Sequence, residues 1–129
     1  MSENKPLPDS GTRTSFGEGM AIREADPNKP RVEGISPFAI FRLGTVFTKG
    51  GQKYGEFRNW EKGMPVTRMI GAIIRHTFQY LARDDSEDHL AAIMWNAQCL
   101  IHYETVGGTS GKTFEELDDR PKWTQPIKK

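Results

Sequence analysis

Apolar side chains recur at helical spacing through the middle of the chain, where they predict three helices. The first is expected to begin at Ser36-Pro37, because serine is a favourable N-cap and proline is tolerated at the first helical position. Ile40, Leu43 and Phe47 then form one apolar stripe. Gly50-Gly51 is expected to end this helix, since glycine readily takes the left-handed conformation found at helix C-termini.

Two further helices are predicted over residues 65–83 and 87–104. The apolar face of the second consists of Val66, Met69, Ile70, Ile73, Ile74, Thr77 and Leu81. The expected buried face of the third consists of Leu90, Ile93, Met94, Ala97, Leu100 and Ile101. Asp85 or Ser86 is its expected N-cap. The pattern therefore predicts an all-α protein, a small bundle of three main helices.

The two ends of the chain lack this periodicity. Residues 1–35 contain four prolines and are predicted to form an extended arm without regular structure, partly packed on a helical domain of residues 36–104. Residues 105–129 are predicted to be a flexible linker and tail with one short helical turn, marked by the capping-box pattern Thr113-x-x-Glu116. A core of about 70 residues is marginally stable by itself, so we expect a homo-oligomer.

Composition and charge narrow the classes of function. The net charge of +1 argues against a protein dedicated to duplex nucleic acid. The single cysteine, Cys99, excludes an internal disulfide and a cysteine-based zinc site. No apolar run approaches the roughly 20 residues that span a bilayer, and no signal-peptide core follows Met1. We therefore predict a cytoplasmic protein that does not bind membranes.

The stretch of residues 50–63 concentrates glycine, aromatic and basic residues. Glycine lets backbone N–H groups approach a ligand closely. The side chains that suit a charged, planar ligand such as a nucleotide are Lys53, Tyr54, Asn59, Trp60 and Lys62. The alternative interpretation is an ordinary turn between helices, with Tyr54 and Trp60 covering the core.

Polar residues on the later helices are further candidates for a site. Arg75 and His76 are neighbours on the second helix. His76 could contact a phosphate, donate a proton or act as a ligand. His89 and Asn96 share one stripe of the third helix. That stripe is either the wall of a site or a polar contact between packed helices. The arm could deliver Arg23 to the same place.

Four carboxylates crowd into five residues before the third helix: Asp84, Asp85, Glu87 and Asp88. Negative charge is favoured at a helix N-terminus, but capping uses only one or two of these groups. Like charges so close repel one another, and a divalent cation or a basic partner relieves that repulsion.

Several spaced motifs resemble one family. They are Ser36-Pro37-Phe38-Ala39, Lys53-Tyr54-Gly55, the run from Asn59 to Gly63, Arg75-His76, the run from Asp88 to Ala92, and Trp95-Asn96. Together with the arm motif from Phe16 to Arg23, they resemble phage and prophage proteins of the dATP/dGTP diphosphohydrolase N-terminal domain family. The likeness covers about residues 11–104, and the family is similar to the all-α MazG-type nucleotide pyrophosphohydrolases.

This resemblance implies a helical fold, oligomerisation and a purine nucleotide as ligand. MazG-type enzymes hold Mg²⁺ with carboxylates on two helices. Here the first helix has no carboxylate, and His89 and Ala92 stand where the later acidic pair is expected. Within the resemblance, Asp85 and Asp88 are then the candidate metal ligands, for Mg²⁺ or Mn²⁺.

Three hypotheses follow. The first is a metal-dependent pyrophosphohydrolase of purine deoxynucleotides, with Lys53, Arg75 and His76 at the phosphates and Tyr54 or Trp60 stacked on the base. The second is a non-catalytic phage sponge that sequesters a nucleotide-derived signal in counter-defence. The third is an oligomeric structural protein without a small ligand.

Overall fold

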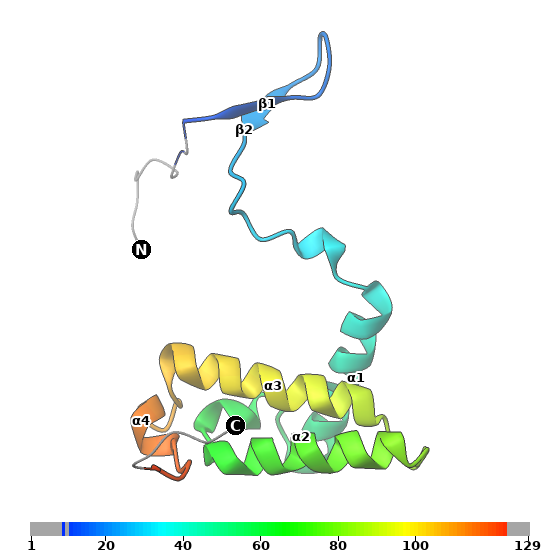
Figure 1. Cartoon of the computed structure of the whole chain (residues 1–129), viewed down its shortest axis with the longest axis vertical. Helices are drawn as coiled ribbons and strands as arrows, with labels where there is room; N and C mark the ends of the chain where they lie inside the picture. The colour runs from blue at the N-terminus through cyan, green and yellow to red at the C-terminus, as the bar shows by residue number, and fades with distance from the viewer. Residues whose placement is uncertain (1–8, 10, 124–129) are drawn as a thin grey trace. The chain divides into compact units, whose positions relative to one another are not determined.

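The protein divides into two compact units, residues 1–35 and residues 36–129, in a computed structural model (Figure 1). The structure describes residue 9 and residues 11–123. Most of the described residues are helical, and the strands form a single two-stranded sheet within this part of the chain. The predicted all-α class is confirmed, while the predicted homo-oligomer stays a prediction.

The first unit contains a short β-hairpin. Strands β1 (Arg13–Ser15) and β2 (Ile22–Glu24) pair antiparallel, with Thr14 opposite Arg23. A 3₁₀ turn, η1, covers Val32–Gly34. The prediction of an arm without regular structure is therefore wrong for these residues, because the pairing of two three-residue strands leaves too short a pattern to recognise in sequence.

Helix α1 spans Pro37–Tyr54 and begins as predicted. Its N-cap is Ser36, whose Oγ accepts a hydrogen bond from the Ala39 N–H at 3.5 Å. Its predicted end at Gly50-Gly51 is wrong, because both glycines lie inside the helix. The left-handed residue at the C-terminus is Gly55, with φ of +85°, and its N–H donates to the Gly51 carbonyl at 2.9 Å.

Helix α2 (Val66–Leu81) follows the 3₁₀ turn η2 (Asn59–Lys62). Pro65, at its N-cap position, supplies no side-chain hydrogen bond. The carboxylate of Asp119 does so instead: it accepts from the Thr67 N–H at 2.8 Å and from the Thr67 hydroxyl at 2.6 Å. These hydrogen bonds lower the pKa of Asp119. The start of α2 is thus capped by a residue 52 positions further along the chain.

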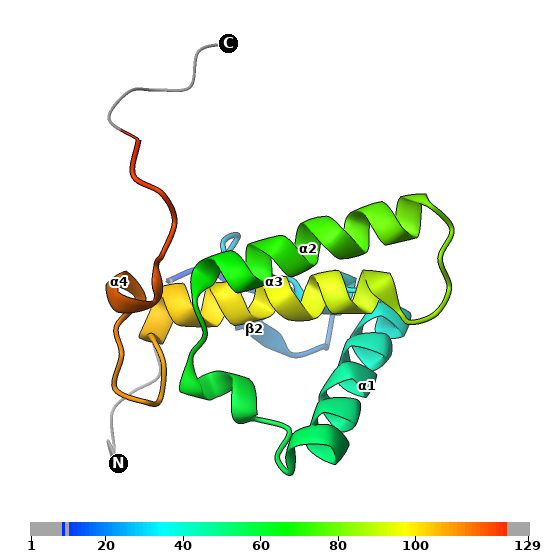
Figure 2. The same cartoon turned by 90° about the horizontal axis from the view of Figure 1, so that it is seen from below.

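Helix α3 (His89–Val106) is central, since it contacts α1, α2 and the short α4. It lies side by side with α2 (Figure 2). Its buried residues are His89, Ala91, Asn96, Cys99 and Tyr103, not the predicted face, of which Ile101 is exposed. Apolar residues occur around most of this helix, so their spacing could not identify the buried side.

The start of α3 also differs from the prediction. Its N-cap is Asp88, which accepts from the Ala91 N–H at 3.2 Å, and neither Asp85 nor Ser86 takes that position. Asp88 is also paired with Arg42 of α1. The cap residue therefore ties the first and third helices together.

The C-terminal segment belongs to the helical unit. Helix α4 (Phe114–Leu117) has the predicted capping box between Thr113 and Glu116. Leu117 joins the core with Trp60, Met69, Cys99 and Tyr103. The prediction of a flexible linker is wrong for the preceding loop: the Thr109 N–H donates to the Glu61 carbonyl at 2.7 Å. Among the described residues, no helix has the length and apolar character needed to cross a membrane.

Candidate functional site

A pocket of about 550 Å³ lies between the second half of α1, η2 and α3, and we call it the α1–η2 pocket. Its lining residues are Val46, Phe47, Lys49, Gly50, Lys53, Tyr54, Glu56, Phe57, Asn59, Trp60, Met64, Glu87 and Trp95. Four of the predicted ligand-binding residues thus meet here: Lys53, Tyr54, Asn59 and Trp60. The size lies within the range of about 300–1,000 Å³ typical of small-molecule sites.

Two lysines on one stripe of α1 line this pocket. Lys49 and Lys53 are one helical turn apart, and no carboxylate occurs in the sequence between Ile35 and Tyr54. Lys49 was not predicted as a site residue; its spacing from Lys53 on a continuous helix is the signal that could have found it. The predicted helix end at Gly50-Gly51 places Lys53 outside the helix, so its helical spacing from Lys49 could not be recognised.

The two predicted aromatic residues have different surroundings. Tyr54 is 60% exposed, and the Lys53 ammonium lies 5.4 Å from the centre of its ring. Trp60 is only 8% exposed and packs edge-on against His102, with ring centres 4.9 Å apart. The Trp60 ring therefore belongs to the core, as the alternative interpretation held for it, while the Tyr54 ring is largely exposed.

Backbone N–H groups of Gly50 and Gly51 do not form the predicted ligand-binding loop, because both residues are helical. Other predicted residues do not line the α1–η2 pocket. Lys62 pairs at 2.7 Å with Glu56, which does line it. The Arg75 guanidinium donates a hydrogen bond to the side-chain oxygen of Gln79 at 3.2 Å and lines a separate pocket on α2. Arg23 lies on β2 in the first unit, so its contribution to a site stays a prediction.

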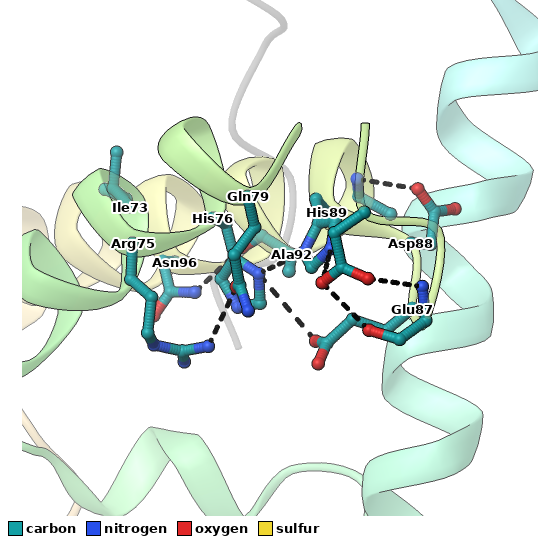
Figure 3. A network of polar contacts seen from close by, with 12 residues as sticks. Ile73, Arg75, His76, Gln79, Glu87, Asp88, His89, Ala92 and Asn96 are labelled. Atoms are coloured by element: carbon teal, nitrogen blue, oxygen red, sulfur yellow. Dashed lines mark hydrogen bonds and ion pairs between the residues drawn. The ribbon is translucent and has the colours of Figure 1, made fainter. Parts of the chain in front are cut away.

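A second polar cluster joins the end of α2 to the start of α3. His76 and His89 are 5% and 2% exposed, and their Nδ1 atoms face each other at 2.8 Å (Figure 3). Glu87 reaches the same place, with Oε1 3.7 Å from Nδ1 of His76. Burial, together with the charge of Arg75, lowers the pKa of His76. Sequence reasoning had identified both histidines separately but not as a pair.

Asp84 orients His89 from the other side of the ring. Its Oδ2 lies 3.1 Å from Nε2 of His89. Asp84 is itself held by Ser86, whose N–H and hydroxyl each donate to it at 3.0 Å, and these bonds lower the pKa of Asp84. The carboxylate therefore accepts a hydrogen bond from Nε2–H and leaves Nδ1 of His89 facing His76.

Asn96 completes the description of the α3 stripe. It is buried, and its Nδ2 donates to the Ala92 carbonyl at 2.8 Å within the same helix. His89 and Asn96 thus lie on the side of α3 that is buried within the helical unit. The Asn96 hydrogen bond stays within α3, so both interpretations of this stripe stay predictions.

The backbone turn after α2 brings Asp84 back towards His89. Arg83 takes the left-handed conformation with φ of +61°, and the Asp84 N–H donates to the Gln79 carbonyl at 3.0 Å. Arg83→Gly is expected to raise the free energy of unfolding by about 0.5–1 kcal/mol, because glycine takes this conformation without steric cost. Urea unfolding followed by circular dichroism measures the change.

Arg68→Gly is the matched control for this substitution. Arg68 is an exposed residue inside α2, where glycine is expected to cost about 1 kcal/mol. If both variants are less stable than the wild type, Arg83 is not strained in its left-handed conformation.

The predicted metal pair, Asp85 and Asp88, does not fit a Mg²⁺ or Mn²⁺ ion. Both carboxylate oxygens of Asp88 accept from Arg42, at 2.6 and 2.8 Å, and this pairing lowers the pKa of Asp88. Asp85 is exposed. The contacts of the other three carboxylates are separate: Asp84 orients His89, Glu87 approaches His76 and Asp88 caps α3. Hard cations need several free oxygen ligands, which this pair does not offer.

The fold and its site define a small helical protein in which an aromatic pocket with charged residues of both signs adjoins a buried histidine pair. Residues 21–112 match the family model described as dATP/dGTP diphosphohydrolase, N-terminal. Because the match covers more than half of the chain, the protein belongs to this family, as the sequence resemblance predicted. Neither the curated proteins nor the solved structures include a match.

Proposed function

We propose that the protein binds a purine deoxynucleotide in the α1–η2 pocket. The observation that carries this proposal is the meeting of Lys49, Lys53 and the exposed Tyr54 ring on one pocket of about 550 Å³. The family name, which specifies dATP and dGTP, supports a purine. Two ammonium groups beside an aromatic ring suit a ligand with phosphates at one end and a planar base at the other.

Different lining residues suit different parts of a nucleotide. Lys49 and Lys53 supply the donors for phosphate oxygens, and Tyr54 supplies a face for the base. Asn59 offers an amide that both donates and accepts, as recognition of a base edge requires. Phe57 and Trp95 form apolar wall. Arg75 and His76 are not needed for this arrangement, since neither lines the pocket.

Nucleotide binding can end in hydrolysis or in retention. Hydrolysis is the activity that the family name describes. Retention, the sponge hypothesis, is favoured by two observations: α1 carries no carboxylate, and Asp88 is already paired with Arg42. Cleavage of a phosphate anhydride depends on strong stabilisation of charge at the phosphates.

The test is a titration of the four deoxynucleoside triphosphates by calorimetry, with and without Mg²⁺ or Mn²⁺. We expect dATP or dGTP to bind and Lys53→Ala to weaken binding by about tenfold or more, because a hydrogen bond to a charged group is lost. Lys112→Ala is the matched control, since Lys112 lies beside Glu116 away from this pocket. Equal affinities in both variants, or no binding of any nucleotide, would overturn the proposal.

Chromatography of the same mixtures separates the two outcomes for the bound nucleotide. Release of monophosphate and pyrophosphate identifies a pyrophosphohydrolase. Nucleotide recovered intact after binding identifies a sponge.

A further inference from the structure

We propose that His76, His89 and Glu87 form a binding site for one divalent transition-metal ion. The two imidazoles come from different helices, and both are almost fully buried. One ligand atom from each of the three residues lies within 4.8 Å of the other two. Two imidazole nitrogens and one carboxylate oxygen are a donor set suited to zinc, cobalt or iron rather than to magnesium.

The orientation of His89 supports a metal ligand. Asp84 lies at Nε2 of His89, so Nδ1 is the nitrogen that faces the cluster. Histidines that bind metals usually donate their other N–H to a carboxylate or carbonyl, which fixes the ring. Asp84 is fixed in turn by two hydrogen bonds from Ser86. This supporting contact is therefore built before any ion arrives.

The distances also agree with a shared ion. Bonds of about 2.0–2.1 Å to each ligand place tetrahedral ligand atoms about 3.3 Å from one another. The observed separations lie on both sides of that value: 2.8 Å between the two Nδ1 atoms and 3.7 Å from Nδ1 of His76 to Glu87 Oε1. The three side chains converge at the junction of α2 and α3 (Figure 3).

Without an ion, hydrogen bonds within the cluster join only two of its three side chains. One proton between the two Nδ1 atoms can link His76 to His89, but Glu87 is then beyond hydrogen-bond distance of His76. A cation attracts the lone pairs of both rings and the Glu87 carboxylate at once.

Glu87 connects this metal site to the α1–η2 pocket. Its side chain is half exposed and lines that pocket, whereas both histidines are buried. Three protein ligands leave a tetrahedral ion one open position, as in catalytic rather than structural sites. An anionic ligand such as a nucleotide phosphate suits that position. This last step rests on the proposed function; the metal site itself does not.

The experiment uses the full chain without an affinity tag, stripped of metal and titrated with Zn²⁺ and Co²⁺ in the absence of nucleotide. We expect one equivalent of either ion to bind, and Co²⁺ to give the visible absorption of a low-coordinate site. Glu87→Gln and His89→Gln are expected to weaken binding by at least tenfold. A large excess of Mg²⁺ should not compete, because it disfavours nitrogen ligands.

His102→Gln is the matched control, since His102 is the third histidine of the chain and packs on Trp60 instead. Circular dichroism checks that each variant folds, and Glu87→Gln keeps the test decisive because it alters a surface side chain. Affinity unchanged in Glu87→Gln and in folded His89→Gln, or no binding of Co²⁺ by the folded protein, would overturn the metal site. Metal binding without nucleotide binding would overturn the proposed function alone.

Discussion

Leu117→Ala is expected to lower the free energy of unfolding by about 3 kcal/mol, measured by urea denaturation. Leu117 is 6% exposed and packs with Trp60, Met69, Cys99 and Tyr103 in the core. Removal of its isobutyl group loses buried apolar surface and leaves a cavity, which costs about 2–5 kcal/mol for leucine. The loss is large for a domain whose total stability is about 5–15 kcal/mol.

The control is the same substitution at Leu81, the last residue of α2, which is 75% exposed. Leu81→Ala is expected to change stability by less than about 0.5 kcal/mol. Similar effects at the two positions would show that α4 does not belong to the core.

Gly108→Ala is expected to destabilise the protein by about 2 kcal/mol or more, seen as a lower melting temperature and a lower urea midpoint. A Cβ atom at this position would lie 2.6 Å from the Lys62 carbonyl oxygen and 3.2 Å from the Gly63 Cα. These are backbone atoms, so the loop itself must move. That movement stretches the bond from the Thr109 N–H to the Glu61 carbonyl, now 2.7 Å.

Gly44→Ala provides the opposite expectation. Gly44 lies inside α1, and an added Cβ atom meets nothing within 4 Å. Alanine should therefore stabilise the helix by about 0.5–1 kcal/mol. A Gly108→Ala protein as stable as the wild type would contradict the close contact between this loop and η2.

Local signals predicted the parts of the fold whose causes lie within a few residues. The Ser36 cap and the Thr113–Glu116 capping box are confirmed for this reason. The end of α1 was missed because Gly50-Gly51 and Gly55 all offer the left-handed conformation, and only tertiary structure selects Gly55. The buried side of α3 was missed because that helix is apolar on several sides.

In the candidate site, too, residues close in sequence were predicted together, whereas those brought in from distant segments were not. Lys53, Tyr54 and Asn59 were predicted together because they are near one another in sequence, and the structure gathers them in one pocket. Glu87 and Trp95 reach that pocket from a distant segment, which no local pattern reveals. His76 and His89 are 13 residues apart. Their pairing depends on the tight turn that Arg83 and Asp84 make between two neighbouring helices.

The cap that Asp119 gives to α2 has a consequence for synthesis on the ribosome. A nascent chain exposes Thr67 long before Asp119 has been translated, because the two are 52 residues apart. Leu117, which packs in the core of the helical unit, is also made late. The partly made chain therefore holds α2 with an uncapped start and an open hydrophobic interior. We therefore expect the complete native structure of this unit only after the segment that carries Leu117 and Asp119 has left the ribosome.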